Sequence, residues 1–565
     1  MIQILKNKKS VDFYLIMMLL AWWLLNLIQS TFTGLANDES YYWLYARELD
    51  WGYFDHPPMT ALLVKLGDFI GGELGIRFFF TILQPLYLYV LWLLIRPESP
   101  TSKDALLFVL ICFAMPILQL YGFIAVPDAP LMMFSALFLW AYNRFCKSDS
   151  WSNMFLLSIS MALLAYSKYH GALVVIFTVL SNLRILLKPK FYLSGLMTLV
   201  LYIPHLMWQY NHDWASFYYH LLGRNGYFRW RDISEFWLNL LLIFNPLYVP
   251  LYIKGFNKGH YADAPVQRAL YFITIGFVTF FSLSSLRGYV QPQWVIPITF
   301  GLIMILFGWS RDKEKVRRYV MRVGYCLAGL MIVVRLIVLF NPFNIKFELF
   351  NNESSYAAIE EVAGDRPVIF GYNYWNGAKY KYYTGNEAYC QPSINYRTSH
   401  WMFRDDDRRM AGKEVMVELY QGTHNAEGTI ELDNGRSFTW ITIPDFYPVR
   451  EVEIDVLNEI PEVVSRGETI KFQTEIKNPY DYDVNISKKG KALKIAWGRN
   501  KEFFKEYFID LESFTVPANS TVRKDFEFVV PDNLDKPEYR MGLIITNYPV
   551  RCWFNSDEYK IEIER

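Results

Sequence analysis

Residues 37–58 read NDESYYWLYARELDWGYFDHPP, a stretch rich in carboxylates and aromatic rings that stands between two long apolar runs. Six acidic side chains occur in this stretch and shortly beyond it: Asp38, Glu39, Glu48, Asp50, Asp55 and Asp68. Tyr and Trp favour the depth of lipid headgroups, so residues 41–48 are predicted to form an amphipathic helix in the membrane interface. Paired carboxylates there suit two tasks, the removal of a proton from a hydroxyl and the orientation of a sugar. A second interpretation, in which Asp38 only caps that helix, stays open.

The composition places most of the chain in a membrane. The chain has 565 residues, of which 53% are hydrophobic and 18% aromatic. Asp, Glu, Lys and Arg number 65 in residues 341–565 but only 46 in the first 340, far below the share of about 25% that globular proteins carry. This excludes a water-soluble single domain and a disordered chain. The net charge of +1 gives no indication of nucleic-acid binding.

Eleven apolar runs approach the length of about 20 residues that a helix needs to cross the hydrocarbon core. They lie near 12–30, 76–95, 104–125, 128–146, 152–168, 171–187, 191–210, 235–253, 267–286, 290–309 and 319–340. The first is not a cleaved signal peptide, because Trp22 and Trp23 occupy its middle and no small-residue cleavage site is present. Residues 1–340 are therefore predicted to be a mainly α membrane domain of about eleven transmembrane helices, with residues 31–75 as its first outside loop.

Lys and Arg in the loops predict the orientation. With the N-terminus in the cytoplasm, 18 of these cations fall on the cytoplasmic side and 8 on the opposite side, as the positive-inside rule requires. An odd number of spans then puts the C-terminal region outside.

The C-terminal region has a different pattern of polar and apolar residues. Residues 341–447 mix a short helical pattern with apolar strand-like runs, which predicts an extracytoplasmic α/β subdomain. Residues 448–565 alternate polar and apolar side chains by twos between turn residues, which predicts a β-sandwich. An accessory role and the binding of a carbohydrate or a partner both remain open for the sandwich. No metal site is predicted, since the five Cys lie far apart without CxxC spacing.

Further polar residues are expected on the outer side. Asp128 stands in VPDAP at the start of a span, where a carboxylate is costly unless it is used or paired, and capping is its simpler role. Arg287, in SLRGYVQPQW (285–294), could hold a phosphate with paired N–H donors or could extend to lipid headgroups. Lys168 is another outer cation, and His56 alone is weak evidence for a metal ligand.

These motifs together resemble a known family. Asp38-Glu39-x-x-Tyr42 followed by GYFDHPP (52–58) looks like the membrane glycosyltransferases of the protein O-mannosyltransferase type, and is close to their bacterial branch, which includes the aminoarabinose transferases that modify lipid A. Asp128 in Pro-Asp-Ala-Pro, Ser167-Lys168-Tyr169 and QPQW (291–294) are similar to later motifs of that family. The resemblance covers about residues 10–340, and more loosely 353–445.

The resemblance implies a C-type glycosyltransferase fold and a multi-pass protein of the inner (plasma) membrane that acts in the cell envelope. It implies transfer of a sugar from a polyprenyl-phosphate donor to a lipid, glycan or protein acceptor outside the cytoplasm, with inversion. Asp38 matches the catalytic aspartate, the general base for the acceptor hydroxyl; Glu39 accompanies it and Asp128 matches a second acidic position. The residues expected to bind substrate are Tyr42, Asp55, His56, Lys168, Arg287, Tyr289 and Gln293.

The chain departs from the family pattern at two positions. His56 falls where some bacterial relatives carry a Lys near the lipid phosphate, and neutral His is a poorer partner for an anion. Tyr41 replaces an Arg of some relatives, and Arg287, Lys168 or Arg47 could compensate for its charge. No nucleotide cofactor is expected, while a divalent metal is neither required nor excluded. Two other functions stay open: a transporter or flippase of lipid-linked sugars, and a scaffold whose outer sandwich binds glycans.

Overall fold

The computed structural model describes residues 2–223, 228–256, 264–371, 373–394, 397–419, 425–488, 490–498, 505–534, 538–547 and 553–564. The chain forms two compact units, Met1–Ile345 and Lys346–Arg565. The first is helical, and the second contains every described strand.

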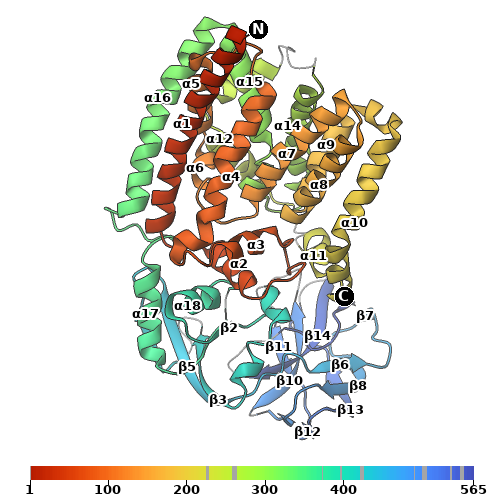
Figure 1. Ribbon diagram of the computed structural model, residues 1–565. Helices are drawn as coiled ribbons and strands as arrows, with labels where there is room; N and C mark the ends of the chain where they lie inside the picture. The colour runs from red at the N-terminus through yellow and green to blue at the C-terminus, as the bar shows by residue number, and fades with distance from the viewer. Residues whose placement is uncertain are drawn as a thin grey trace. The chain divides into compact units, whose positions relative to one another are not determined.

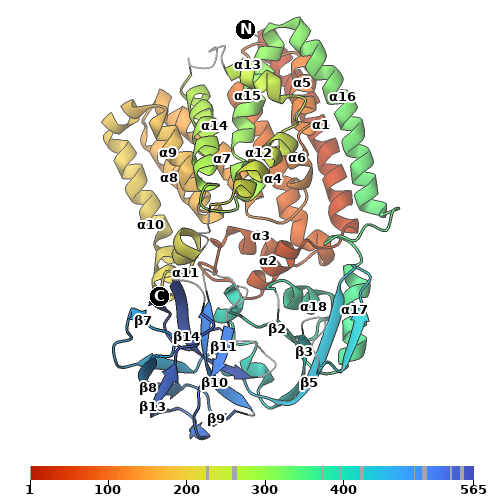
Figure 2. The same cartoon turned by 180° about the vertical axis from the view of Figure 1, so that it is seen from behind.

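The helices of the first unit run along one another, while α2 and α3 lie across the end away from the N-terminus (Figure 1; Figure 2 from behind). Their bounds are α1 (Ile2–Phe32), α2 (Asn37–Arg47), α3 (Met59–Leu66), α4 (Gly72–Ile95), α5 (Ser102–Phe113), α6 (Pro116–Leu120), α7 (Asp128–Lys147), α8 (Trp151–Ser167), α9 (Gly171–Leu180), η1 (Leu183–Leu187), α10 (Pro189–Asn211), α11 (Ala215–Tyr218), η2 (Tyr219–Gly223), α12 (Trp230–Ile243), α13 (Val249–Phe256), α14 (Pro265–Ser284), η3 (Pro292–Val295), α15 (Ile298–Asp312) and α16 (Glu314–Phe340).

Within the ranges that the structure describes, five helices are long and apolar enough to cross a membrane, namely α1 from Lys9 onward, α4, α10, α14 and α16. Large apolar side chains are exposed along α10 and α16, and such surfaces are stable only in lipid. The protein is therefore a membrane protein. All eleven predicted runs fall on helices, but the number of spans stays a prediction.

Four of the predicted runs are not continuous helices. Residues 171–187 form α9 and the 3₁₀ helix η1, and residues 290–309 form η3 and α15. Residues 104–125 form α5 and α6, because Pro116 lacks an N–H and fits only the first turn of the new helix. Residues 235–253 form α12 and α13, which are separated at Asn245 (φ 71°) and Pro246. The prediction of a single helix is wrong at these four places.

The second unit begins with an α/β subdomain. Its sheet has the order β2-β1-β3-β5-β4, in which β1 pairs in parallel with β2 and β3. Its elements are α17 (Asn352–Ala363), β1 (Val368–Phe370), α18 (Asn376–Thr384), β2 (Ala388–Cys390), η4 (His400–Phe403), η5 (Arg408–Met410), β3 (Lys413–Leu419), β4 (Gly428–Glu431) and β5 (Ser437–Phe446).

The remaining strands form two sheets around one apolar core. One has the order β12-β9-β10-β14-β15-β7 with β11 beside β10, and the other the order β13-β8-β6. The Trp497 ring from β10 lies 6.4 Å from Phe528 of β13, so the two sheets face each other as a sandwich. The bounds are β6 (Glu453–Val456), β7 (Val463–Val464), β8 (Thr469–Asn478), β9 (Val484–Ile486), β10 (Lys491–Gly498), β11 (Lys505–Phe508), β12 (Phe514–Val516), β13 (Ser520–Val529), β14 (Glu538–Asn547) and β15 (Tyr559–Ile563).

Candidate functional site

Glu39 anchors the first turn of α2. Its side chain is fully buried, and its Oε1 accepts from Arg77 Nε at 2.6 Å and from the Ala125 amide at 2.8 Å. Its Oε2 accepts from Arg77 Nη2 and from the Ala36 amide at 2.9 Å. Arg77 donates its other N–H groups to the Ser30 carbonyl in the last turn of α1 and to the Thr33 and Gly34 carbonyls that follow it. Four donors therefore saturate the Glu39 carboxylate, which ties α2 to α4 and to the segment before α7.

Asp38 is the neighbour of Glu39 in the same turn but differs in exposure. Successive residues on an α-helix point about 100° apart, and Asp38 is half-buried where Glu39 is sealed. The N-cap of α2 is Ala36, and the carboxylate that bonds its amide belongs to Glu39. The interpretation of Asp38 as the cap of this helix is therefore wrong. α2 also begins earlier than the predicted helix of residues 41–48.

Aromatic rings from α2 and from the following loop pack into one wall. Tyr45 and Tyr53 stack with ring centroids 4.2 Å apart, and the Tyr42 ring lies 5.5 Å from His56. Tyr45 Oη donates to Asp55 Oδ1 at 2.6 Å. Burial and the nearby Asp55 charge raise the pKa of Tyr45 well above its usual value, so the phenol remains a donor. Tyr42, Asp55 and His56, all expected to bind substrate, thus belong to one packed group.

The loop after α2 is fastened to the end of α10. Trp208 Nε1 donates to Asp50 Oδ2 at 2.7 Å, and His205 Nδ1 lies 2.7 Å from the Trp51 carbonyl. A Cβ at Gly52 would lie only 2.4 Å from the Trp208 ring, so this close approach requires glycine. Sequence reasoning missed Trp208 and His205, because no local pattern pairs residues that are more than 150 positions apart.

Asp128 and Lys168 form a second buried ion pair. Lys168 Nζ lies 2.8 Å from Asp128 Oδ1, and both side chains are about 95% buried. Asp128 is the first residue of α7, where the helix dipole favours a negative charge, and Lys168 directly follows the end of α8. The pair therefore joins the start of α7 to the end of α8. The sequence did not indicate that Lys168 has a carboxylate partner.

The QPQW segment lies beside the turn that carries Lys168. The His170 ring is 5.3 Å from Trp294, whose Nε1 donates to Gln291 Oε1 at 2.8 Å. Gln293 is half-buried in η3, and its Nε2 lies 3.3 Å from the same oxygen. QPQW and Lys168-Tyr169-His170 therefore meet at one end of the helical unit.

Arg287 and Tyr289 are exposed on the loop before η3. The Arg287 side chain makes no hydrogen bond or ion pair within the part of the chain that the structure describes. Partial burial of the phenol, together with the Glu235 and Asp232 charges, raises the pKa of Tyr289. Arg287 is thus a cation that remains available to an incoming anion.

Direct contacts place the two candidate acids, Asp38 and Asp128, at the same end of the helical unit. Glu39, next to Asp38, accepts from the Ala125 amide, and Ala125 lies three residues before Asp128. From Asp128 the contacts continue through Lys168 to the QPQW segment. Among the described residues no group of three or more His, Cys, Asp or Glu is arranged to hold a metal.

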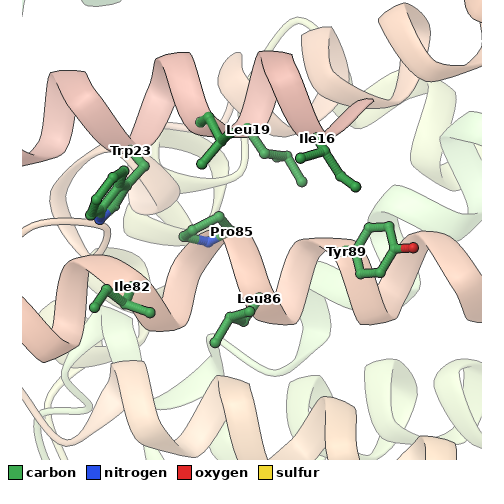
Figure 3. A pocket seen from close by; sticks show the side chains of 8 residues that line it. Ile16, Leu19, Trp23, Ile82, Pro85, Leu86 and Tyr89 are labelled. Atoms are coloured by element: carbon green, nitrogen blue, oxygen red, sulfur yellow. The ribbon is translucent and has the colours of Figure 1, made fainter. Parts of the chain in front are cut away.

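An apolar groove of about 440 Å³ lies between α1 and α4, away from these polar residues. Figure 3 shows Trp23, Leu19 and Ile16 on one helix facing Ile82, Pro85, Leu86 and Tyr89 on the other. None of the candidate site residues lines the groove, so it offers a hydrocarbon surface and no chemistry.

Comparison with known proteins identifies the fold. Residues 55–208 match the family model of the dolichyl-phosphate-mannose-protein mannosyltransferases. The structure is similar to that of ArnT from Cupriavidus metallidurans bound to undecaprenyl phosphate, with a TM-score of 0.56 and 13% identity over 75% of this chain and 97% of that chain. The chain has the C-type glycosyltransferase fold. The resemblance expected from the Asp38–Pro58 motif is confirmed.

Other matches to this C-type glycosyltransferase fold are weaker. The oligosaccharyltransferase of Archaeoglobus fulgidus, tethered with an acceptor peptide, gives a TM-score of 0.43 and 12% identity over 95% of this chain and 98% of that chain. Arabinosyltransferase EmbB from Mycobacterium smegmatis gives 0.32 and 10% over 92% of this chain and 61% of that chain. The fold assignment does not depend on these two. No curated protein sequence gives a significant match.

Proposed function

We propose that the protein transfers a sugar from a polyprenyl-phosphate donor to a hydroxyl acceptor at the outer face of the plasma membrane, with Asp38 as general base. The observation that carries the proposal is the contact of Glu39 with Ala125. It brings the half-buried Asp38 and the Asp128–Lys168 pair to one end of a C-type glycosyltransferase fold. The family match over residues 55–208 and the undecaprenyl phosphate in the ArnT structure support this donor class.

In the proposed reaction the acceptor oxygen attacks the anomeric carbon from the face opposite the lipid phosphate. The new C–O bond forms as the bond to the phosphate breaks, the configuration inverts, and polyprenyl phosphate leaves with the electron pair. Asp38 takes the proton of the hydroxyl. A general base typically increases the reaction rate by about 10²- to 10⁴-fold. A cation near the phosphate stabilises the charge that grows on it, and the exposed Arg287 suits this task.

The other candidate residues take supporting roles in this proposal. Glu39 has no free acceptor capacity beyond its four donors, which suits the positioning of Asp38 better than proton transfer. Lys168, held by Asp128, keeps a positive charge near the site without being a flexible surface cation. Tyr42, Asp55 and His56 form the aromatic and polar wall against which a sugar could pack.

The test uses purified protein in liposomes that contain a labelled polyprenyl-phosphate sugar, with lipid A, glycan and peptide acceptors offered in turn. Asp38→Asn is expected to lower kcat by about 10²- to 10⁴-fold while donor binding stays within about twofold of wild type. Asp68→Asn is the matched control, since Asp68 lies exposed beyond the same loop and pairs with Lys65 at 3.0 Å. Transfer at the wild-type rate by Asp38→Asn would exclude Asp38 as the base. Parallel assays with and without a chelator would reveal any metal dependence.

A further inference from the structure

An irregular segment separates α6 from α7. Residues 121–127 form turns and open backbone between two apolar helices, and the preceding helix α6 has only five residues. The last carbonyls of a helix lack partners within it, and an unpaired carbonyl at membrane depth is costly. Turns satisfy part of this backbone, since the Leu120 carbonyl accepts from the Phe123 and Ile124 amides. The Leu118 and Gln119 carbonyls at the end of α6 need donors from other helices.

Gln84 and Arg335 supply these hydrogen bonds. Gln84 Nε2 of α4 donates to the Leu118 carbonyl at 2.6 Å, and Arg335 Nη2 of α16 donates to the Gln119 carbonyl at 3.0 Å. Arg335 Nε also donates to Gln119 Oε1 at 2.9 Å, and its Nη2 to Asn26 Oδ1 of α1 at 2.7 Å. Asn26 in turn donates to Gln84 Oε1 at 2.7 Å. One network thus joins α1, α4, α6 and α16.

Arg335 is an unusual member of this network. It lies in a helix that is apolar enough to span the membrane, it is 93% buried, and all its partners in the described residues are neutral. Its Nη1 has no hydrogen-bond partner among those residues. A charge kept inside a membrane protein without a counter-charge is rare and generally functional.

The same segment adjoins both candidate acids. Its Ala125 amide bonds Glu39 beside Asp38, and its last residue directly precedes Asp128. The Phe123 ring lies 5.8 Å from the Arg77 guanidinium and 5.7 Å from that of Arg335. The segment therefore connects the Arg335 network to the Glu39–Arg77 pair.

We propose that Arg335 is a positioning residue for the transfer reaction: by holding residues 118–127 it fixes the first turn of α2 and the start of α7, and with them Asp38 and Asp128. The proposal rests on the proposed function. It predicts that loss of the guanidinium displaces reacting groups without removing any of them. Misplacement by about 1 Å can cost about 100-fold in rate, so the effect should appear in kcat.

The test compares Arg335→Gln, Arg335→Lys and Arg322→Gln in the full-length protein. Arg322 is the control, because it lies on the same helix but is exposed. Arg335→Gln is expected to lower kcat by about 10- to 100-fold with the donor KM changed by less than about threefold. Arg335→Lys keeps the charge but loses the planar guanidinium with its several N–H donors, so its kcat should lie between those of Arg335→Gln and the wild type.

Hydrogen exchange gives a readout that does not depend on activity. Residues 37–47 and 121–127 should exchange faster in Arg335→Gln, to a smaller degree in Arg335→Lys, and as in wild type in Arg322→Gln, while α10 and α14 stay unchanged. Wild-type exchange at residues 37–47 in both Arg335 variants, or faster exchange spread evenly over the helical unit, would overturn the proposal. If the wild-type protein transfers no sugar, the proposed function fails, whereas the exchange result still decides whether Arg335 holds these segments.

Discussion

Glu39 at the first turn of α2 and Glu418 near the end of β3 are both buried beside an arginine, yet their surroundings differ. Glu39 accepts from two N–H groups of Arg77 and from two backbone amides. Glu418 has Arg436 Nη2 at 3.3 Å from Oε1 and the Gly371 amide at 3.3 Å from Oε2, both at the long end of the hydrogen-bond range.

The two sets of hydrogen-bond donors indicate a different role for each carboxylate. A buried carboxylate that has a full set of short donors fixes the backbone around it. Burial disfavours the charged form of a carboxylate, and few and long hydrogen bonds offset this only in part. Burial accordingly raises the pKa of Glu418 to about 7. The end of β3 should therefore respond to pH.

The largest expected effect comes from breaking the α2 anchor. Arg77→Met leaves Glu39 buried without its counter-charge, which should lower the free energy of unfolding by about 3–5 kcal/mol. Arg77→Met combined with Glu39→Met removes both charges and should recover much of that loss. Thermal unfolding of the purified proteins in detergent measures the loss of stability in Arg77→Met and its recovery in the double variant. If the double variant is as unstable as Arg77→Met, the Glu39 charge is not the cause of the instability.

The next prediction concerns pH and the Glu418 side of the comparison. The pKa of Glu418 is raised from 4.5 to about 7 in the folded state. Between these values the unfolded chain loses a proton that the folded chain keeps, so the stability of this subdomain should fall as pH rises, by about 3 kcal/mol in total, and level off above pH 7. Hydrogen exchange of β1, β3 and β5, corrected for the chemical exchange rate at each pH, measures this slope.

Glu418→Gln should flatten that slope, while Glu414→Gln should retain it. Glu414 is the suitable control because it lies on the same strand with its side chain about half exposed. A slope that persists unchanged in Glu418→Gln would assign the pH response to another group and would remove the contrast with Glu39.

The two glutamates also show how far the sequence could predict the site. The carboxylate-rich stretch was readable from residues 37–58, and its place beside the membrane from the apolar runs that flank it. The family resemblance came from this stretch together with the later motifs around Asp128, Lys168 and QPQW. The partner of Glu39 could not be predicted from the sequence, because Arg77 lies 38 residues away near the start of another helix. Hydrophobic patterns predict which residues are buried, but they do not predict which buried polar groups meet.

The same limit explains the rest of the comparison between sequence and structure. Alternating residues such as Ile470–Ile476 predicted the sandwich, because a period of two directly reports a sheet with one buried face. Lys168 was predicted as a cation for substrate, and its pairing with Asp128 depends on how α7 and α8 pack. The breaks at Pro116 and Asn245 were hidden within apolar runs, since hydropathy alone cannot separate one helix from two short ones.

Arg287 extends the comparison to a charge that has no partner among the described residues, and it carries the smallest expected effect. An exposed cation gains little from an ion pair, about 0.2–1 kcal/mol, and salt screens that gain. Arg287→Gln should therefore raise the KM for the polyprenyl-phosphate donor by about two- to fivefold at low salt and lower kcat by a similarly small factor, because the cation also faces the charge that grows on the leaving phosphate. Both differences should shrink at high salt. Arg318→Gln is the control, since Arg318 is exposed near the start of α16, a region predicted to face the cytoplasm. An unchanged KM at low salt would leave Lys168 as the better candidate for the phosphate, and would mean that a buried, paired cation rather than an exposed one recognises the donor.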